Sequence, residues 1–159
     1  MGYDDFNMEE ILSIAERIER NGADFYREAA AGASSDVARR TLEELAGMED
    51  QHEQTFSGMK AELTEKERQS DIFDMDNEAA EYMKALADRR VFHKREVDMT
   101  SMKAILTEAL AIEKDSIAFY RGMRNLVPSK RGKDKVDNVI KEEMSHVVTI
   151  TEKLGELDE

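Results

Sequence analysis

The chain has 159 residues, of which 36 are Asp or Glu and 23 are Lys or Arg, so its formal net charge is −13. That charge argues against binding to nucleic acid or to an anionic membrane, because such proteins gather Lys and Arg into a patch. The absence of cysteine excludes disulfides, thiolate metal ligands and a cysteine nucleophile. A hydrophobic content of 40%, with one proline and eight glycines, favours a single domain (residues 1–159) built from long helices.

The sequence also lacks the signals of membrane insertion and export. No apolar run approaches the length that is needed to span a bilayer. The first residues form neither the basic segment nor the apolar segment of a signal peptide. We therefore expect a cytoplasmic protein.

Four stretches of the chain carry apolar residues at helical spacing. In chain order, these stripes cover residues 11–29, 38–63, 102–123 and 136–154. Asn7 is expected to cap the first helix, and Ser34 or Ser35 the second. Pro128 and Gly132 predict the turn before the fourth helix. Between the second and third stripes the pattern is less regular and predicts only a short helix around 77–88.

The two halves of the chain repeat each other at an offset of 94 residues. Over residues 11–27, 8 of the 17 positions are identical to their counterparts, where ordinary composition predicts about one. The same offset aligns the second helix of each half without a gap. The repeat predicts two duplicated helical hairpins, at about 7–64 and 99–156, joined by a crossover at about 65–98. The expected fold is therefore all-α, an antiparallel four-helix bundle.

Four glutamates lie in or beside these apolar stripes, and two of them are followed by histidine three residues later, on the same helix face. Burying four carboxylates together is prohibitively costly unless they take up protons or bind cations. Two divalent cations would offset the four charges, and two imidazoles would complete the ligand set. The predicted metal ligands are Glu19, Glu49, His52, Glu113, Glu143 and His146.

The strength of this prediction lies in the duplication. A single Glu-x-x-His on a helix is weak evidence, because exposed acidic helices often contain one. Glu53 and Glu142 lie close enough in sequence to replace a predicted ligand. The repeat disfavours both, since their counterparts are Val147 and Met48.

Two tyrosines follow the first glutamate of each half by seven residues, two turns along the same face. Tyr26 follows Glu19, and Tyr120 follows Glu113. We expect each hydroxyl to hydrogen-bond the ligand carboxylate of the other half and so to orient it. The alternative is a core tyrosine with its hydroxyl at the rim.

Other residues near the predicted site receive plainer interpretations. Phe25 and Phe119 are expected to be core residues. Gly22 and Ser116 occupy equivalent places one turn after a predicted ligand, where small side chains leave room for metal, solvent or an oxygen substrate. His93 has no duplicated partner and is interpreted as a surface or packing histidine.

The duplicated Glu, Glu-x-x-His and Phe-Tyr motifs resemble those of the rubrerythrin group of the ferritin-like superfamily. The resemblance covers about 8–64 and 99–156. It implies a four-helix bundle with a long connection between the second and third helices. It also implies a di-iron centre that reduces hydrogen peroxide, while related bundles oxidise ferrous iron or activate dioxygen.

The chain departs from that resemblance in two ways. Typical rubrerythrins carry a rubredoxin domain with four cysteines, whereas this chain has none. Electrons must then come from a separate donor protein, either rubredoxin-like or a flavoprotein. Typical rubrerythrins also carry an extra glutamate where this chain has Ser116, which leaves a more symmetric site of six ligands.

Three functions are consistent with these motifs. The first is a di-iron oxidoreductase that acts on peroxide or dioxygen, the second is ferroxidase activity with iron storage or delivery, and the third is a non-catalytic metal-binding bundle. Two iron ions are the expected cofactor; manganese also suits these ligands, and zinc can substitute adventitiously. We expect a homodimer, because symmetric pairs are the commonest homo-oligomers.

Overall fold

The computed structural model describes residues 7–69, 78–87 and 96–157. This part of the chain contains four long helices and two short ones. In chain order they are α1 (Met8–Ala31), α2 (Asp36–Glu62), α3 (Glu65–Gln69), α4 (Glu78–Ala87), α5 (Met102–Arg124) and α6 (Lys130–Leu157). The predicted all-α four-helix bundle is confirmed. The predicted short helix in the crossover corresponds to α4, whereas the pattern gave no sign of α3. His93 lies outside the described residues.

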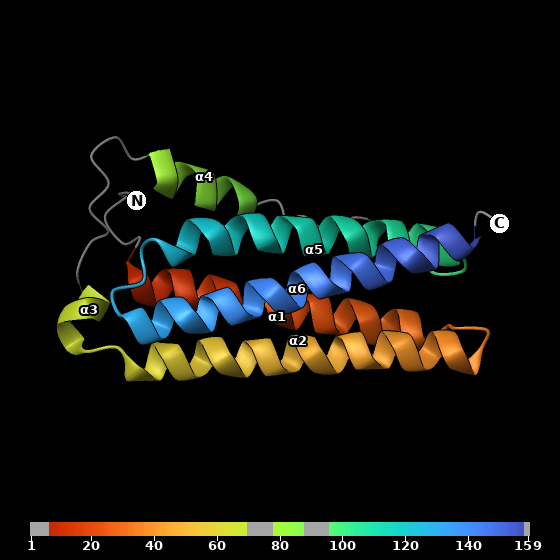
Figure 1. Ribbon diagram of the computed structural model, residues 1–159, viewed down its shortest axis with the longest axis horizontal. Helices are drawn as coiled ribbons and strands as arrows, with labels where there is room; N and C mark the ends of the chain where they lie inside the picture. The colour runs from red at the N-terminus through yellow and green to blue at the C-terminus, as the bar shows by residue number, and fades with distance from the viewer. Residues whose placement is uncertain (1–6, 70–77, 88–95, 158–159) are drawn as a thin grey trace.

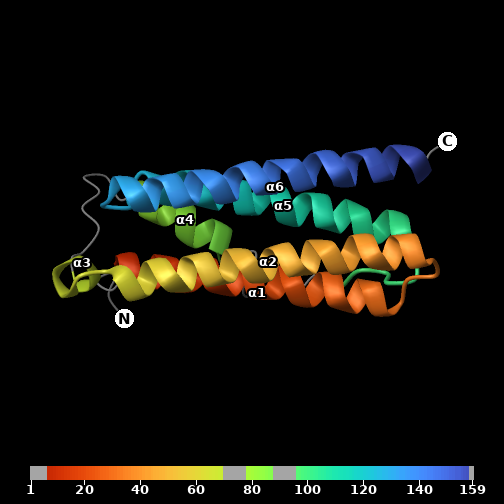
Figure 2. The ribbon, with the colours of Figure 1, turned by 60° about the horizontal axis from the view of Figure 1, so that its bottom comes forward.

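The bundle consists of two antiparallel hairpins that lie side by side, α1 with α2 and α5 with α6 (Figures 1 and 2). The connection between α2 and α5 returns the chain to the other end of the bundle, so that these two helices run in the same direction (Figure 1). Within that connection, α4 lies along α5 (Figures 1 and 2). Met83 of α4 is fully buried and joins the core at that place.

Polar side chains begin the helices where the sequence predicted. Asn7 Oδ1 accepts a hydrogen bond of 2.9 Å from the backbone N–H of Glu10 at the start of α1. Ser35, rather than Ser34, caps α2 by accepting from Ala38 N at 3.1 Å. These bonds satisfy backbone donors that have no partner inside the helix.

The turn before α6 differs from the prediction. Gly132 lies inside α6, which begins at Lys130, rather than in the preceding turn. The reason for glycine here is close packing, because a Cβ at Gly132 would lie 2.6 Å from Val127 Cγ1. The helix starts earlier because Ser129 Oγ accepts a hydrogen bond of 3.0 Å from Gly132 N.

Two apolar clusters fill the bundle at different levels along its length. One includes Ile11, Phe56 and Phe119, and the other includes Leu42 and Ile105. Phe119 is fully buried as expected, whereas Phe25 is only partly buried against the second cluster. On every long helix, the predicted metal ligands lie in sequence between residues of the two clusters. The core therefore holds a polar layer with apolar packing on both sides.

Candidate metal centre

All six predicted ligands lie in this polar layer and are buried. None of them is more than 7% exposed. One glutamate comes from α1, one from α5, and a Glu-x-x-His pair comes from each of α2 and α6. Ionisable side chains are almost never fully buried unless they are paired. We refer to Glu19, Glu49, His52, Glu113, Glu143 and His146 as the carboxylate–histidine cluster.

The cluster divides into two overlapping groups of potential ligand atoms. In each group one atom from every residue lies within 4.8 Å of the others. The first group is Glu19, Glu49, His52 and Glu143, and the second is Glu49, Glu113, Glu143 and His146. Glu49 and Glu143 belong to both groups. The geometry therefore offers two adjacent cation positions that share two carboxylates.

Both histidines turn the same ring nitrogen into the cluster. His52 Nδ1 lies 2.9 Å from Glu143 Oε1 and 3.5 Å from Glu19 Oε2. His146 Nδ1 lies 3.4 Å from Glu113 Oε1 and 3.5 Å from Glu143 Oε2. The two rings are roughly parallel, at 26°, with centroids 6.0 Å apart. Each ring thus presents Nδ1 to a different one of the two positions.

The predicted hydrogen bonds of the two tyrosines are confirmed. Tyr26 OH donates to Glu113 Oε1 at 2.6 Å, and Tyr120 OH donates to Glu19 Oε1 at 2.5 Å. Each bond joins one half of the repeat to the other. Burial, together with nearby carboxylates, raises the pKa of both tyrosines well above 10. Both hydroxyls therefore remain protonated donors that fix one oxygen of each carboxylate.

Burial and neighbouring charges shift the pKa values of several cluster residues. Burial, reinforced by the charges of Glu143 and Glu49, raises the pKa of Glu19 well above 4.5. Burial also favours neutral Glu143, but the neighbouring His146 and His52 outweigh it and lower its pKa to about 2. For His146 burial favours the neutral ring, yet the carboxylates of Glu143 and Glu49 raise its pKa to about 9. The pKa of His52 is raised in the same way against the effect of burial, chiefly by Glu143.

Protons and hydrogen bonds nevertheless leave much of the cluster unsatisfied. Within the described part of the chain, one buried atom on each of several cluster residues has no hydrogen-bond partner. These atoms are Glu19 Oε2, Glu49 Oε1, Glu113 Oε2, Glu143 Oε2 and His146 Nδ1. Buried polar atoms without partners are rare and costly in folded proteins. Five such atoms converging from four helices fit a site that is completed by cations.

Residues near the cluster clarify the remaining sequence predictions. Ser116 is buried, but its hydroxyl donates to Ile112 O at 2.9 Å on its own helix, so it adds no ligand. Glu53 pairs with Arg20 at 2.7 Å, outside the cluster.

Glu142 is no member of either group, yet its Oε2 lies 2.5 Å from His52 Nε2. The sequence pattern did not predict this bond. The sequence held one sign of it. Glu142 is an acidic residue next to the predicted ligand Glu143, and it has no acidic counterpart in the first half of the repeat.

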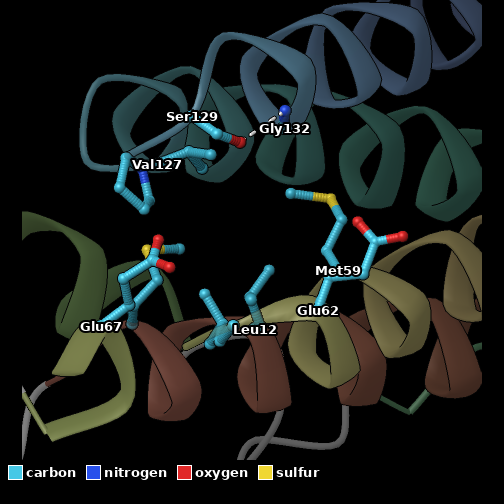
Figure 3. Close-up of a pocket in the computed structure, with 10 residues that line it drawn as sticks. Leu12, Met59, Glu62, Glu67, Val127, Ser129 and Gly132 are labelled. Atoms are coloured by element: carbon cyan, nitrogen blue, oxygen red, sulfur yellow. Dashed lines mark hydrogen bonds between the residues drawn. The ribbon is translucent and has the colours of Figure 1, made fainter. Parts of the chain in front are cut away.

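The bundle has a groove along its side and a cavity near one of its ends. A groove of about 340 Å³ between α2 and α6 is lined by His52 and Glu142, among other residues. A smaller cavity of about 110 Å³ lies where the start of α6 faces α1 and α2 (Figure 3). Its walls are largely apolar, as with Leu12 and Met59, and no member of the carboxylate–histidine cluster lines it. The larger groove is therefore the one that reaches the cluster.

Comparison with known proteins establishes the fold. No family model matches the chain, and no curated protein sequence matches it. The chain is similar to the crystal structure, at 2.30 Å resolution, of a Thermotoga maritima protein described provisionally as a ferritin-like diiron-carboxylate protein. The TM-score is 0.72 with 24% sequence identity, covering 98% of this chain and 99% of that one. The chain therefore has a ferritin-like fold.

The described helices do not meet the requirements of a membrane span. Not one of them combines the length and apolar character that crossing a bilayer demands.

Proposed function

We propose that the chain is a non-haem di-iron protein that reduces hydrogen peroxide or activates dioxygen with electrons from a separate donor protein. The observation that carries this proposal is the pair of overlapping ligand groups that share Glu49 and Glu143. Carboxylates with imidazoles suit iron and manganese, and this arrangement is typical of ferritin-like di-iron bundles. The likeness to a provisionally described diiron-carboxylate protein supports the choice of iron.

Each residue of the cluster has a distinct role in this proposal. Glu49 and Glu143 would serve both positions, because each belongs to both groups. Glu19 with His52 completes one position, and Glu113 with His146 completes the other. A pair of ferrous ions held by these residues would supply two electrons, the number needed to cleave one peroxide O–O bond.

Two surrounding side chains hold carboxylates of the cluster in place. Tyr26 and Tyr120 each tie down one carboxylate oxygen and leave the other oxygen of Glu113 and Glu19 free to bind. Hydrogen-bonded ligands of this kind cost less entropy to order when the ion binds.

The chain has no cysteine, so it holds no thiolate-ligated electron carrier of its own. A separate donor is the reductant in this proposal.

The activity is tested with protein that is loaded anaerobically with ferrous iron. We expect one equivalent of peroxide to oxidise about two iron ions per chain in a stopped-flow experiment, because peroxide accepts two electrons and each ferrous ion gives one. After reduction, the same bound iron should support further turnovers. If iron instead accumulates beyond about two per chain in a large assembly, the protein stores iron. Oxidation no faster than that of iron in buffer would contradict both activities.

A glycine-to-alanine exchange tests whether Glu49 binds metal. A Cβ added at Gly22 would lie 3.2 Å from Glu49 Oε2, so alanine must displace that carboxylate by a few tenths of an ångström. We expect Gly22→Ala to weaken metal binding by roughly tenfold, or about 1.4 kcal/mol. The metal-free protein should keep or raise its melting temperature, because alanine favours a helix by about 1 kcal/mol. Isothermal titration and thermal unfolding measure the two effects.

Gly47→Ala is the matched control for this exchange. Gly47 lies within α2, and no described atom comes within 4 Å of a Cβ added there. It should gain helix stability and keep the wild-type metal affinity. Equal metal affinities for the two variants would show that the Glu49 carboxylate near Gly22 is not a ligand.

A further inference from the structure

The 94-residue repeat makes the two halves of the carboxylate–histidine cluster nearly equivalent. Every member has a counterpart of the same type, and the tyrosine bonds are duplicated as well. The symmetry fails beside the histidines. Glu142 corresponds to Met48, and a thioether cannot replace a carboxylate as a hydrogen-bond acceptor. This exchange is one place where the surroundings of the two cation positions differ.

Glu142 reaches the outer nitrogen of His52 across the interface between α2 and α6. Glu142 Oε2 lies 2.5 Å from His52 Nε2, while His52 Nδ1 faces the cluster. An ionised carboxylate only accepts hydrogen bonds, so Nε2–H is the donor. The ring is thus held at both nitrogens, with Nδ1 directed at Glu143 and Glu19.

The environment of this bond leaves the carboxylate accessible. The Glu142 side chain is 45% exposed, whereas that of His52 is 2% exposed. Both residues line the 340 Å³ groove, together with polar side chains such as Gln51, Thr55 and Asn138. Glu142 therefore stands between solvent and a buried imidazole.

We propose that Glu142 is a positioning residue that makes the two cation positions unequal. By holding His52 Nε2–H, it orients the ring and increases the basicity of Nδ1, so the position of Glu19 and His52 binds its ion more tightly. Carboxylates that contact metal-ligating histidines in this way typically change metal affinity by about 10–100-fold. This inference rests on the proposed function, because it requires that the cluster binds metal.

The inference is tested by titrating metal-free protein with Co²⁺ and following the cobalt absorption bands. We expect the wild-type protein to bind two ions in two resolvable steps. Glu142→Ala should weaken only the tighter step, by about 10–100-fold, and shift the bands of that ion. Glu142→Gln keeps an acceptor oxygen without the charge and should give an intermediate loss. Met48→Glu should tighten the weaker step and bring the two affinities together.

Variants with one histidine assign the effect to a position. In the His146→Ala background the exchange Glu142→Ala should still weaken cobalt binding by about 10–100-fold. In the His52→Ala background it should change nothing, because its partner is gone. Circular dichroism confirms that each variant is folded. If a histidine variant does not fold, the two-step titrations of Glu142→Ala and Met48→Glu decide alone.

The possible results separate this inference from the proposed function. A wild-type protein that binds no cobalt and no iron refutes the proposed function. A wild-type protein that binds two ions, with unchanged steps in Glu142→Ala, overturns the inference alone. An equal loss at both steps also overturns it, because that result indicates a general structural effect. A slower rate of loading at unchanged affinity overturns it as well, and identifies Glu142 as a residue of an entry path instead.

Discussion

Glu143→Ala is expected to remove both ions from the protein, whereas Glu19→Ala is expected to remove one. Glu143 belongs to both ligand groups, while Glu19 belongs to a single group. Loss of a shared carboxylate leaves each position with three of its four ligands and leaves three carboxylates to offset the four charges of two divalent cations. We expect iron content to fall from about two ions per chain to well below one for Glu143→Ala, and to about one for Glu19→Ala. Elemental analysis of the purified variants measures this difference.

An exposed glutamate provides the control for these exchanges. Glu44 lies on α2, the helix of Glu49, and its side chain faces solvent. Glu44→Ala changes the net charge of the protein as Glu143→Ala does, and it should keep the wild-type iron content. The assignment of Glu143 as a shared ligand is wrong if Glu143→Ala retains full iron and full peroxide turnover.

The metal-free protein is expected to lose stability as the pH rises from about 6.5 to about 9. The pKa of His146 is raised from 6.5 to about 9, because Glu143 and Glu49 outweigh the effect of burial. A group with a raised pKa stabilises the fold fully below its unfolded pKa, and this stability is lost as the pH rises through the folded value. The difference corresponds to about 3 kcal/mol at about 1.4 kcal/mol per pH unit. Glu19, whose pKa is also raised, acts in the same direction.

Urea unfolding in the presence of a chelator measures this effect at a series of pH values. A loss of about 3 kcal/mol is a large part of the 5–15 kcal/mol that stabilises a typical domain. His146→Gln should make the profile less steep, since one of the titrating groups is gone. With metal bound the slope should reverse, because cations compete with protons for the same ligands and bind better at higher pH. A metal-free stability that stays constant or increases over this range would contradict the account of the cluster.

The sequence predicted the bundle and the cluster for the same reason. Helical spacing places residues on one face of a helix. The 94-residue repeat then identifies which acidic residues of that face are candidate metal ligands. Glu19 and Glu113 are ordinary helical glutamates by themselves, and only their common offset with Glu49 and Glu143 distinguishes them. The duplication also predicted the tyrosine bonds, because a symmetric pair of contacts satisfies both halves at once.

Other features depend on how the helices face each other, which spacing along one helix does not specify. Glu142 bonds His52 across the contact between α2 and α6, so the rotation and translation of both helices determine the contact. The prediction of a turn at Gly132 is wrong because close approach of Val127, rather than a turn, requires glycine there. The packing of α4 against α5 could not be predicted either, since a ten-residue helix has no fixed partner until the bundle forms.

The most direct test of the account is the number and position of metal ions in protein purified anaerobically from iron-supplemented cells. Elemental analysis should give about two iron ions per chain. Anomalous diffraction from crystals of that protein should place both ions between Glu49 and Glu143, one beside His52 and the other beside His146. Folded protein with no metal, or with metal bound elsewhere, would contradict the account and would leave the carboxylate–histidine cluster as a set of buried, proton-bound side chains.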